Sequence, residues 1–347
     1  MYLRGSFDMG KFRLKRSVSV RKAPNGAITF GMAPPRHFIL ENPPEFLSSL
    51  LDLLNEPHSL EEVSKRLIDE NQDRKVSDIS QVWHELIDLN IFEVPRQIRR
   101  YDRHELYFDI FNVSADQYAS LANKKIGLIG AGGIGSTCAL LLAAAGIGTI
   151  SLADDDLLEE TNLPRVVLLE ESDIGLPKIQ QIQEKIKARN SKTRIESRLS
   201  KISGPEDILS FFGNCDAWIL SADTPSQLIQ EWTNTAALQT QTPYISAGYA
   251  EINGMIGPFI IPGETPCHNC RVLEGNVPSG QQINKKVQAT SYGPLNTIVS
   301  AMAVNEVIRF LLGLDVSTKG SQIILNSSNY ETVWQQLTFS KSCTCRS

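Results

Sequence analysis

A group of glycines followed by a group of acidic side chains is the pattern in this chain best suited to chemistry. The glycines are Gly130, Gly132, Gly133 and Gly135, and the acids are Asp154, Asp155 and Asp156. The glycines separate an apolar run, 125–129, from small apolar residues at 134–145, and the acids close a second apolar run, 149–153. Glycine lets the backbone turn tightly and approach a phosphate, a helix N-terminus offers free N–H groups, and an acid after the second strand can hold a ribose. The pattern predicts a strand, a turn, a helix and a strand that bind a nucleotide, although such turns also occur without a ligand.

The residues that follow distinguish a dinucleotide from ATP. Asn162, Arg165 and Lys178 come after the acids. A hydride-transfer enzyme has no need of these groups there, whereas a triphosphate with its magnesium needs cations to offset its charge. Lys178 lies in the first turn of a predicted helix, where a cation is mildly unfavourable, and nothing but a phosphate would obviously offset that cost. The balance favours ATP.

Four of the six cysteines form two close pairs, Cys267 with Cys270 and Cys343 with Cys345. This grouping is typical of reduced metal ligands rather than of a secreted disulfide scaffold. Four thiolates can close a tetrahedral structural zinc site, and such a site leaves no open position for catalysis. The C-x-C spacing of the second pair strains chelation, so a disulfide or a frayed segment is the alternative. The two other cysteines, Cys138 and Cys215, lie in apolar surroundings and are expected in the core.

The region 116–347 alternates predicted strands with predicted helices. The strands are expected at 125–129, 149–153, 194–198, 217–221 and 244–248, and the main helices at 134–145, 176–189, 225–238 and 295–312. This alternation indicates an α/β fold with a Rossmann-like, doubly wound and mostly parallel sheet, whose ligand binds at the carboxyl ends of the strands. Asp154, Asp156 and Asp223 all follow predicted strands, which makes them candidates for that site.

Residues 1–95 have a different pattern of apolar residues and turns from the region 116–347. Residues 12–20 alternate enough for a strand, Asn25-Gly26 is a hairpin turn, and 27–30 is the expected partner strand. Three helices are expected after it, at 44–54, after a capping box formed by Ser59 and Glu62, and at 76–89. We predict a small α+β, winged-helix-like domain, joined through a linker at 96–115 to the larger domain at 116–347.

Length and charge limit the class of protein. At 347 residues the chain can form one large and one small domain, since length divided by roughly 150 is a soft guide to domain number. A net charge of -5 and an isoelectric point near 5.7 argue against a nucleic-acid partner, because phosphate neutralisation needs clustered basic residues. No apolar run approaches the ~18 residues needed to cross a bilayer, and the first residues lack the apolar core of a signal peptide. We therefore expect a cytoplasmic protein with no membrane partner.

Several motifs agree with one known family. They are Arg-Tyr-Asp-Arg at 100–103, the glycine turn, Asp154-x-Asp156, Asn162-x-x-Arg165, Gly175-x-Pro177-Lys178, Ser221-Ala222-Asp223 and Cys267-x-x-Cys270. From about Arg100 to Arg346 the chain resembles the ubiquitin-activating-type adenylating enzymes, the ThiF/MoeB/MccB family. The family usually has C-x-x-C as its second cysteine pair, whereas this chain has C-x-C.

The resemblance implies roles for individual residues. Asp154 resembles the ribose-binding acid, and Asp223 resembles the acid that binds magnesium. Asn162, Arg165 and Lys178 resemble the group that holds the phosphates and stabilises the transition state.

Arg103 resembles the arginine that family members offer across a dimer to the partner's ATP, which implies a homodimer. Without this resemblance, a lone arginine in a linker is most simply a solvated surface residue.

The expected activity follows from two further observations. Residues 1–95 resemble the PqqD-like clamp that holds a leader peptide, with β-augmentation as the expected mode, although a cap or a dimerisation element is the alternative. No cysteine lies between Arg271 and Ser342, so the region 275–292 cannot supply the thiol that relatives use for thioester or persulfide transfer.

We therefore expect ATP-dependent activation of a carboxylate, a glutamate side chain, in a ribosomally made precursor peptide, followed by intramolecular condensation or cyclisation in natural-product biosynthesis. The alternatives are activation of a C-terminal residue to a nucleotide-peptide conjugate, activation of a ubiquitin-like sulfur carrier, and a non-catalytic peptide-binding scaffold.

Overall fold

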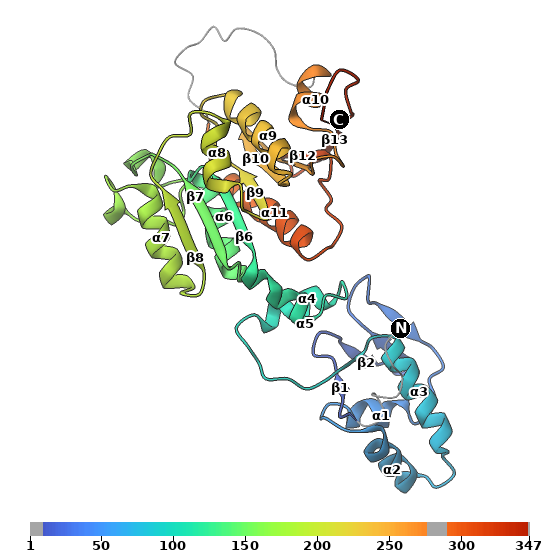
Figure 1. Cartoon of the computed structure of the whole chain (residues 1–347). Coiled ribbons are helices and arrows are strands. Elements are labelled where there is room, and N and C mark those ends of the chain that lie inside the picture. Colours follow the sequence, from blue (N-terminus) through green and yellow to red (C-terminus); the bar gives the residue numbers. More distant parts are fainter. Residues whose placement is uncertain (1–9, 276–289, 346–347) are drawn as a thin grey trace. The chain divides into compact units, whose positions relative to one another are not determined.

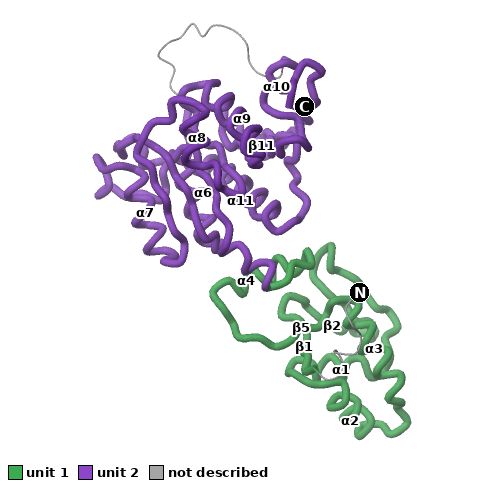
Figure 2. Tube along the Cα trace, viewed as in Figure 1, with its two compact units in different colours: residues 1–115 green, residues 116–347 purple. Residues whose placement is uncertain are grey.

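The chain forms two compact units, residues 1–115 and residues 116–347 (Figure 2). The structure is a computed structural model that describes residues 10–275 and 290–345. Each unit has its own cluster of buried hydrophobic side chains. No helix in the described ranges is long and apolar enough to span a membrane.

The larger unit is organised around an eight-stranded sheet in the order β13-β12-β11-β10-β9-β6-β7-β8 (Figure 1). The strands from β10 to β8 pair in parallel, and β11, β12 and β13 extend the sheet with antiparallel pairs. This arrangement confirms the expected Rossmann-like, mostly parallel α/β fold. The strands are β6 (Lys125–Ile129), β7 (Thr149–Ala153), β8 (Arg194–Arg198), β9 (Ala217–Leu220), β10 (Tyr244–Ala250), β11 (Asn253–Ile260), β12 (Ser321–Asn326) and β13 (Thr332–Gln336).

Helices cover both faces of this sheet, as its crossover connections require. Helix α6 packs against α7 and α11, whereas α8 packs against α9. The small side chains of α6 allow close approach, and most of the helix is buried. The helices are α5 (Ala115–Ala119), α6 (Gly133–Ala145), α7 (Lys178–Arg189), α8 (Pro205–Phe212), α9 (Leu228–Thr240), α10 (His268–Leu273) and α11 (Gly293–Leu311).

The order of the parallel strands reverses at the centre of the sheet. From β6 the chain adds β7 and β8 on one side and then returns to place β9 and β10 on the other. Adjacent loops therefore diverge at the carboxyl ends of β6 and β9, and such a switch point is where doubly wound sheets bind ligands. Gly130 directly follows β6, and the segment containing Asp223 follows β9.

The smaller unit combines three short strands with three helices. Strands β2 (Val20–Lys22), β3 (Ile28–Phe30) and β4 (Phe38–Leu40) form an antiparallel sheet. The helices are α1 (Leu47–Leu53), α2 (Leu60–Glu70) and α3 (Val76–Asp88). The expected capping box is present, because the Ser59 Oγ accepts a bond from the Glu62 N–H and the Glu62 carboxylate accepts one from the Ser59 N–H. The buried indole of Trp83 lies in the core of this unit.

One expectation for this part of the chain is wrong. Residues 12–20 do not form one strand, since β1 (Arg13–Leu14) pairs with β5 (Phe92–Glu93) and β2 starts only at Val20. The physical reason is that Lys15, between them, turns inward to form an ion pair with Asp109 at 2.7 Å. The segment predicted as a linker, 96–115, contains α4 (Asp102–Asp109).

Candidate functional site

The glycine turn is shaped by close packing on one side and open space on the other. Gly130 has a φ of +100°, which L side chains rarely adopt. A Cβ at Gly135 would lie 2.0 Å from the carbonyl oxygen of Gly130, so only glycine lets α6 start this close to β6. A Cβ at Gly132 would meet nothing within 4 Å. The turn therefore keeps its backbone accessible at the point where a phosphate would approach.

Asp154 fixes this turn from the end of β7. One carboxylate oxygen accepts a hydrogen bond from the Ala131 N–H at 2.7 Å, and the other accepts one from the Asp156 N–H at 2.9 Å. Burial raises the pKa of Asp154, against the two backbone hydrogen bonds that favour its charged form. Each oxygen keeps a second lone pair, so the carboxylate can still accept a bond from a ribose hydroxyl.

Lys178 has a partner that the sequence did not reveal. Its Nζ lies 2.8 Å from a carboxylate oxygen of Asp156, and its backbone N–H donates to the Asp156 carbonyl oxygen at 3.1 Å. The expectation that only a phosphate could offset the cost of this lysine was therefore wrong. Lys178 is buried and Asp156 is exposed. The ion pair therefore holds the Lys178 ammonium group in a fixed position in the site.

Arg165 is held by a turn in which Asn162 is the central residue. The Asn162 side chain accepts a bond from the Glu159 N–H, and its carbonyl oxygen accepts bonds from the N–H groups of Arg165 and Val166. The guanidinium of Arg165 also donates to the Thr161 carbonyl at 2.8 Å. Asn162 is buried within this turn, where it positions Arg165, and its expected contact with a phosphate stays a prediction.

These elements enclose a cavity of about 330 Å³, called here the nucleotide cavity. It brings together most of the predicted site residues, namely Gly130, Gly132, Gly133, Asp154, Asp156, Arg165, Lys178 and Asp223. Gly135 and Asn162 are not among the described residues that line it. Gly135 packs against Gly130 of the turn, and Asn162 holds the turn that carries Arg165.

Sequence reasoning missed Asn296, which lines the nucleotide cavity from the first turns of α11. The side chain is 1% exposed, and its Oδ1 has no hydrogen-bond partner among the described residues. Its amide nitrogen donates to the Ser291 Oγ at 3.1 Å, which leaves the oxygen as an acceptor for a ligand or a water molecule. No local motif marks this asparagine, because it reaches the cavity from a distant helix.

Arg103 lies on α4 in the smaller unit. Its neighbours Asp102 and Glu105 are buried and form ion pairs with Arg16 and Arg96, respectively. The hydrogen bond from Arg16 is the main reason that the pKa of Asp102 lies below its ordinary value. Arg103 itself is exposed and forms no ion pair with any described residue. Its guanidinium is thus free to meet a group outside this unit, as its expected role in a partner's site requires.

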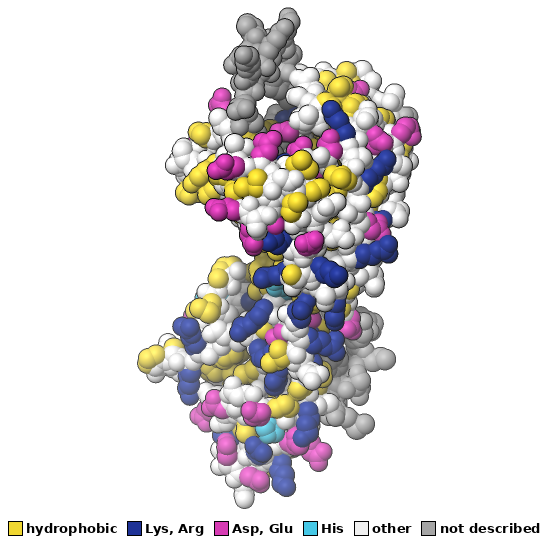
Figure 3. All heavy atoms as spheres, turned by 90° about the vertical axis from the view of Figure 1, so that its left-hand side faces the viewer, with side chains coloured by type: hydrophobic (Ala, Val, Ile, Leu, Met, Phe, Trp, Pro, Cys, Tyr) yellow, Lys and Arg dark blue, Asp and Glu magenta, His cyan; other side chains and the backbone are white. Residues whose placement is uncertain are grey.

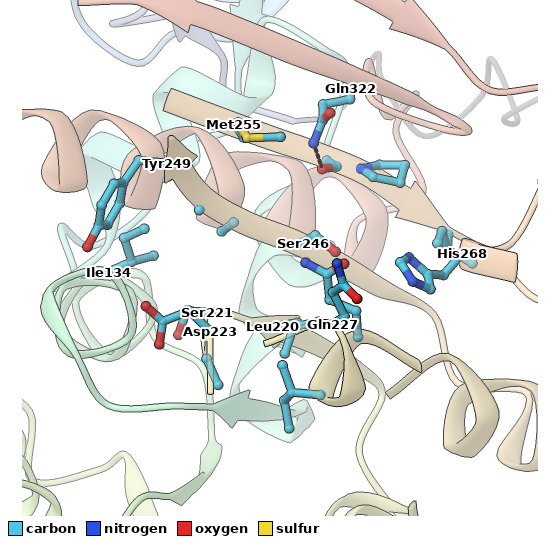
Figure 4. Close-up of a pocket in the computed structure, with 18 of the residues that line it drawn as sticks. Ile134, Leu220, Ser221, Asp223, Gln227, Ser246, Tyr249, Met255, His268 and Gln322 are labelled. Atoms are coloured by element: carbon cyan, nitrogen blue, oxygen red, sulfur yellow. Dashed lines mark hydrogen bonds between the residues drawn. The ribbon is translucent and has the colours of Figure 1, made fainter. Parts of the chain in front are cut away.

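A second cavity, of about 210 Å³, adjoins the first and is called here the acceptor cavity (Figure 4). Asp223 and Tyr249 line both cavities. In Figure 4, Asp223 lies toward one side and His268 toward the other, with Ser246 and Gln227 between them. Burial is the main reason that the pKa of His268 falls to about 4, so this imidazole is neutral near pH 7. The shared wall places any group in the acceptor cavity beside the nucleotide cavity.

The four paired cysteines meet in space. The Sγ atoms of Cys267 and Cys343 lie 3.5 Å apart, as do those of Cys270 and Cys345. All four Sγ atoms lie within 4.8 Å of one another, and none is in a disulfide. Tetrahedral zinc with Zn–S bonds of about 2.3 Å separates its sulfurs by about 3.8 Å. The donor set therefore fits zinc, and the C-x-C spacing does not prevent the cluster.

The two other cysteines are poor nucleophiles. Burial raises the pKa of Cys138 to about 12 and that of Cys215 to about 11. Both thiols are therefore protonated near neutral pH, and the thiolate is the reactive form. Their expected place in the core is confirmed.

A doubly wound sheet with a glycine turn, an acid after β7 and cations around a cavity of about 330 Å³ defines a nucleotide-binding α/β protein. The chain belongs to the ThiF family, which matches residues 101–347. It is accordingly an adenylating enzyme, as the sequence resemblance implied.

Relatives by sequence include two bacterial proteins. The sulfur carrier protein ThiS adenylyltransferase of Escherichia coli is 26% identical over 251 residues, which are 72% of this chain and 94% of that protein. The probable adenylyltransferase/sulfurtransferase MoeZ of Mycobacterium tuberculosis is 25% identical over 240 residues, 68% of this chain. The match spans only 60% of the length of MoeZ.

Similarity to solved structures extends over both units. E. coli MccB, in a crystal structure with MccA-N7isoASN, is 25% identical with a TM-score of 0.81, and the match covers 97% of this chain and 99% of MccB. A structure of E. coli MccB with ATP gives a TM-score of 0.80 over 96% of this chain and 99% of that one. PaaA is 22% identical with a TM-score of 0.78 over 94% of this chain and 100% of PaaA, which shows a shared fold.

Proposed function

We propose that this enzyme uses ATP and Mg²⁺ to adenylate a carboxylate, a glutamate side chain, of a ribosomally made precursor peptide. The observation that carries the proposal is the similarity to MccB over 97% of the chain, because it includes the smaller unit, which lies almost entirely outside the ThiF match. MccB has been solved with ATP and with MccA. In this reading, the larger unit activates the peptide and the smaller unit holds its leader.

Adenylation would join the peptide carboxylate to the AMP part of ATP. A carboxylate oxygen of the peptide attacks the α-phosphorus of ATP, the bond to the bridging oxygen breaks, and pyrophosphate leaves. Arg165 and Lys178 stabilise the charge that develops on the phosphates, and Arg103 from a partner subunit does the same in a homodimer. Asp223 would hold the Mg²⁺ that accompanies ATP, because carboxylate oxygens are the ligands that this ion prefers.

The acyl-adenylate then reacts within the peptide. A neighbouring nucleophile of the same peptide attacks the acyl carbon, AMP leaves, and the nucleophile loses its proton, so the net change in the peptide is the loss of water. An intramolecular acceptor fits the absence of cysteine between Arg271 and Ser342. Of that region, residues 276–289 lie outside the described ranges.

The leader would bind at the edge of the small sheet. In the sheet order β2-β3-β4, β2 is an edge strand, so it turns one row of backbone groups away from the sheet. A hollow beside β2 and α1 is lined by the apolar side chains of Leu14, Val20, Ile28 and Leu51. Addition of a peptide strand to β2, with apolar side chains in this hollow, is the mode of β-augmentation. This groove, at Leu14, Val20, Ile28 and Leu51, is called here the leader groove.

Charge favours a peptide over a nucleic acid as the partner. Acidic and basic side chains both occur on the face of each unit seen in Figure 3. The net charge of the chain is -5, and nucleic-acid binding needs a clustered basic surplus.

Zinc would serve a structural role. Cys267, Cys270, Cys343 and Cys345 would ligate it, and it would tie residues 343–345 to α10. Four protein ligands leave no position for a substrate, so the ion supplies stability rather than chemistry.

An enzyme that adenylates a ubiquitin-like sulfur carrier protein is the second candidate. The match to the ThiS adenylyltransferase of Escherichia coli, which covers 94% of that protein, favours it. Such an enzyme would adenylate a protein that ends in Gly-Gly and would not need the leader groove. Activation of a C-terminal residue to a nucleotide-peptide conjugate is a variant of the main proposal, and a non-catalytic scaffold is the remaining alternative.

One experiment separates these possibilities. Precursor peptides encoded near the gene, or a carrier protein ending in Gly-Gly, are incubated with the enzyme and ATP-Mg²⁺, and masses and nucleotide products are resolved. We expect AMP, pyrophosphate and a peptide that has lost water. A peptide that gains an AMP moiety would indicate the conjugate, and adenylation of the carrier alone would refute the peptide proposal. Absence of ATP turnover with all of them would support the scaffold.

A further inference from the structure

Strands β11, β12 and β13 carry a row of apolar side chains that starts at the acceptor cavity. Met255 on β11 lines that cavity and pairs with Ile324 on β12, which in turn pairs with Val333 on β13. Residues that pair across a sheet lie on the same face, so these three side chains lead from the cavity to the edge of the sheet at β13. Met255, Ile324 and Val333 are called here the apolar row.

The opposite face of these strands is covered, whereas the apolar row is not. A Cβ at Gly254 would lie 2.7 Å from a side-chain carbon of Val299 on α11, so that face of β11 packs against the helix. Ile323 and Leu325, on the same covered face of β12, are 6% and 7% exposed. In the apolar row, by contrast, Val333 is 60% exposed. An antiparallel sheet commonly turns polar side chains to solvent, so an uncovered apolar row is suited to receive an apolar partner.

Amide side chains flank the apolar row on both sides. Asn253 pairs with Asn326 on one side of it, and Gln322 pairs with Gln335 on the other. Each of these four is two residues from a member of the row along its own strand, so it lies on the same face. The amide groups of Asn253 and Gln335 have no hydrogen-bond partner in the part of the chain that the structure describes. An amide both donates and accepts, so these groups can bond to the N–H and C=O groups of a peptide.

The position of the row sets the distance at which a bound peptide would meet it. Met255 belongs both to the row and to the wall of the acceptor cavity, where Figure 4 shows it. Gly248 on β10 lines the same cavity and pairs with Met255. From Gly248 to Val333 is therefore three strand spacings, or about 14 Å at roughly 4.8 Å each. An extended chain covers this distance in about four residues.

We propose that the apolar row binds an apolar side chain of the substrate peptide, about three or four residues from the carboxylate that is adenylated. This inference rests on the proposed function, since the occupant of the row is the same peptide. None of the paired residues in the apolar and amide rows is charged, which favours a neutral segment of peptide. A second copy of the chain is a poorer occupant, because three side chains bury far less than the ~800 Å² per partner of a stable interface.

The test uses the full chain and capped nine-residue peptides of Gly and Ser with one central Glu, in which a single Leu is moved through the other positions. Their affinities are measured by NMR titration in the presence of Mg²⁺ and a non-hydrolysable ATP analogue. We expect a Leu three or four residues from the Glu, on one side of it, to tighten binding at least about tenfold over the peptide without Leu, the scale of one buried Leu side chain.

Two neighbouring positions on β13 supply the variant and its control. Val333→Asp places a charge in the apolar row and should remove the preference for Leu, whereas Val333→Ile should keep it. Trp334→Asp introduces the same charge one residue further along the strand, on the opposite face, and should keep it as well. Both positions are more than half exposed, and binding of the ATP analogue reports that the variants are folded.

Several outcomes would overturn the inference. They are equal affinities of all the peptides for the unaltered enzyme, no binding of any of them, a preference that survives in Val333→Asp, or an equal loss in Trp334→Asp. Dissociation of a dimer in Val333→Asp, with the preference kept, would assign the row to contacts between copies instead.

The same variants separate this inference from the proposed function. A preference for Leu that Val333→Asp removes, in an enzyme that adenylates no peptide, would leave the apolar row standing and refute the proposed function. Adenylation of a precursor peptide with the same KM in Val333→Asp would do the reverse.

Discussion

The nucleotide cavity and the proposed leader groove present backbone groups in opposite ways. In the larger unit the glycine turn is fixed before any ligand arrives. Asp154 accepts hydrogen bonds from the N–H groups of Ala131 and Asp156. Gly135 packs closely against Gly130. In the smaller unit the edge of β2 is simply left without a neighbouring strand in the described sheet. A preorganised site stabilises charge in a reaction, whereas an open edge accepts many sequences that supply the missing strand.

The largest expected effect tests the preorganised site. Lys178→Ala should reduce peptide-dependent pyrophosphate exchange by at least about 100-fold, because it removes a fixed cation beside the phosphates. The variant also leaves Asp156 without its ion pair, so its thermal unfolding must be compared with that of the unaltered enzyme. Lys192→Ala, at an exposed lysine of the same unit, is the matched control. Full exchange activity in Lys178→Ala would show that this lysine serves only Asp156.

Removal of the metal is expected to affect stability more than chemistry. If zinc binds the four thiolates, Cys270→Ser should lower the Tm by on the order of 10 °C, and a chelator should lower that of the unaltered enzyme similarly. The chelator should have no further effect on Cys270→Ser. Metal content measured by mass spectrometry checks the assignment, and one zinc per chain is expected. A metal-free enzyme with an unchanged Tm would exclude this role.

A bulky side chain can fill the leader groove without any substitution in the larger unit. Ser48 lines the hollow from α1, and its neighbour Ser49 does not contact the described groove. Ser48→Trp should raise the KM for a precursor peptide by about tenfold, the scale of one lost apolar contact, and leave ATP binding unchanged. Ser49→Trp, which adds the same side chain one position away, should do neither. Equal effects of the two substitutions would mean that the peptide binds elsewhere.

The smallest expected effect concerns the link between α4 and the rest of its unit. Arg16 holds the pKa of Asp102 below its ordinary value of 3.8, so the pair stabilises the folded state above that pH and the stabilisation is lost as pH falls through the lowered pKa. Asp102→Asn should therefore cost about 1 kcal/mol near pH 7 and make acid unfolding below pH 4 less steep. Denaturant titrations at several pH values measure this. An unchanged pH dependence would show that the pair contributes little.

The sequence was sufficient for the core of the larger unit because its signals are local. Strands β6, β7 and β9 are continuous apolar runs, and the glycine spacing dictates the turn at Gly130. The ends of these strands then place Asp154 and Asp223 at one cavity, as the reversal of strand order requires. The family membership adds to this result but is not needed for it.

The parts that could not be predicted depend on contacts between distant segments. Asn296 and Arg271 reach their cavities from helices that carry no nucleotide motif. The pairing of Lys178 with Asp156 needs the bridge that brings Leu157 and Pro177 together. Strand β4 was missed because its register depends on pairing with β3, where Phe38 stacks on Phe30 with centroids 4.8 Å apart.

Helix α10 links the cysteine cluster to the acceptor cavity, and this sets an order in time. Cys267 and Cys270 lie at and within this short helix, and their neighbours His268 and Arg271 line the cavity. The sulfurs that complete the cluster belong to Cys343 and Cys345, more than seventy residues downstream. During translation, the glycine turn can therefore fold long before the ribosome has released the residues that fix α10. The nucleotide cavity, whose lining ends at Asn296, is therefore synthesised in full before the two cysteines that complete the cluster beside α10.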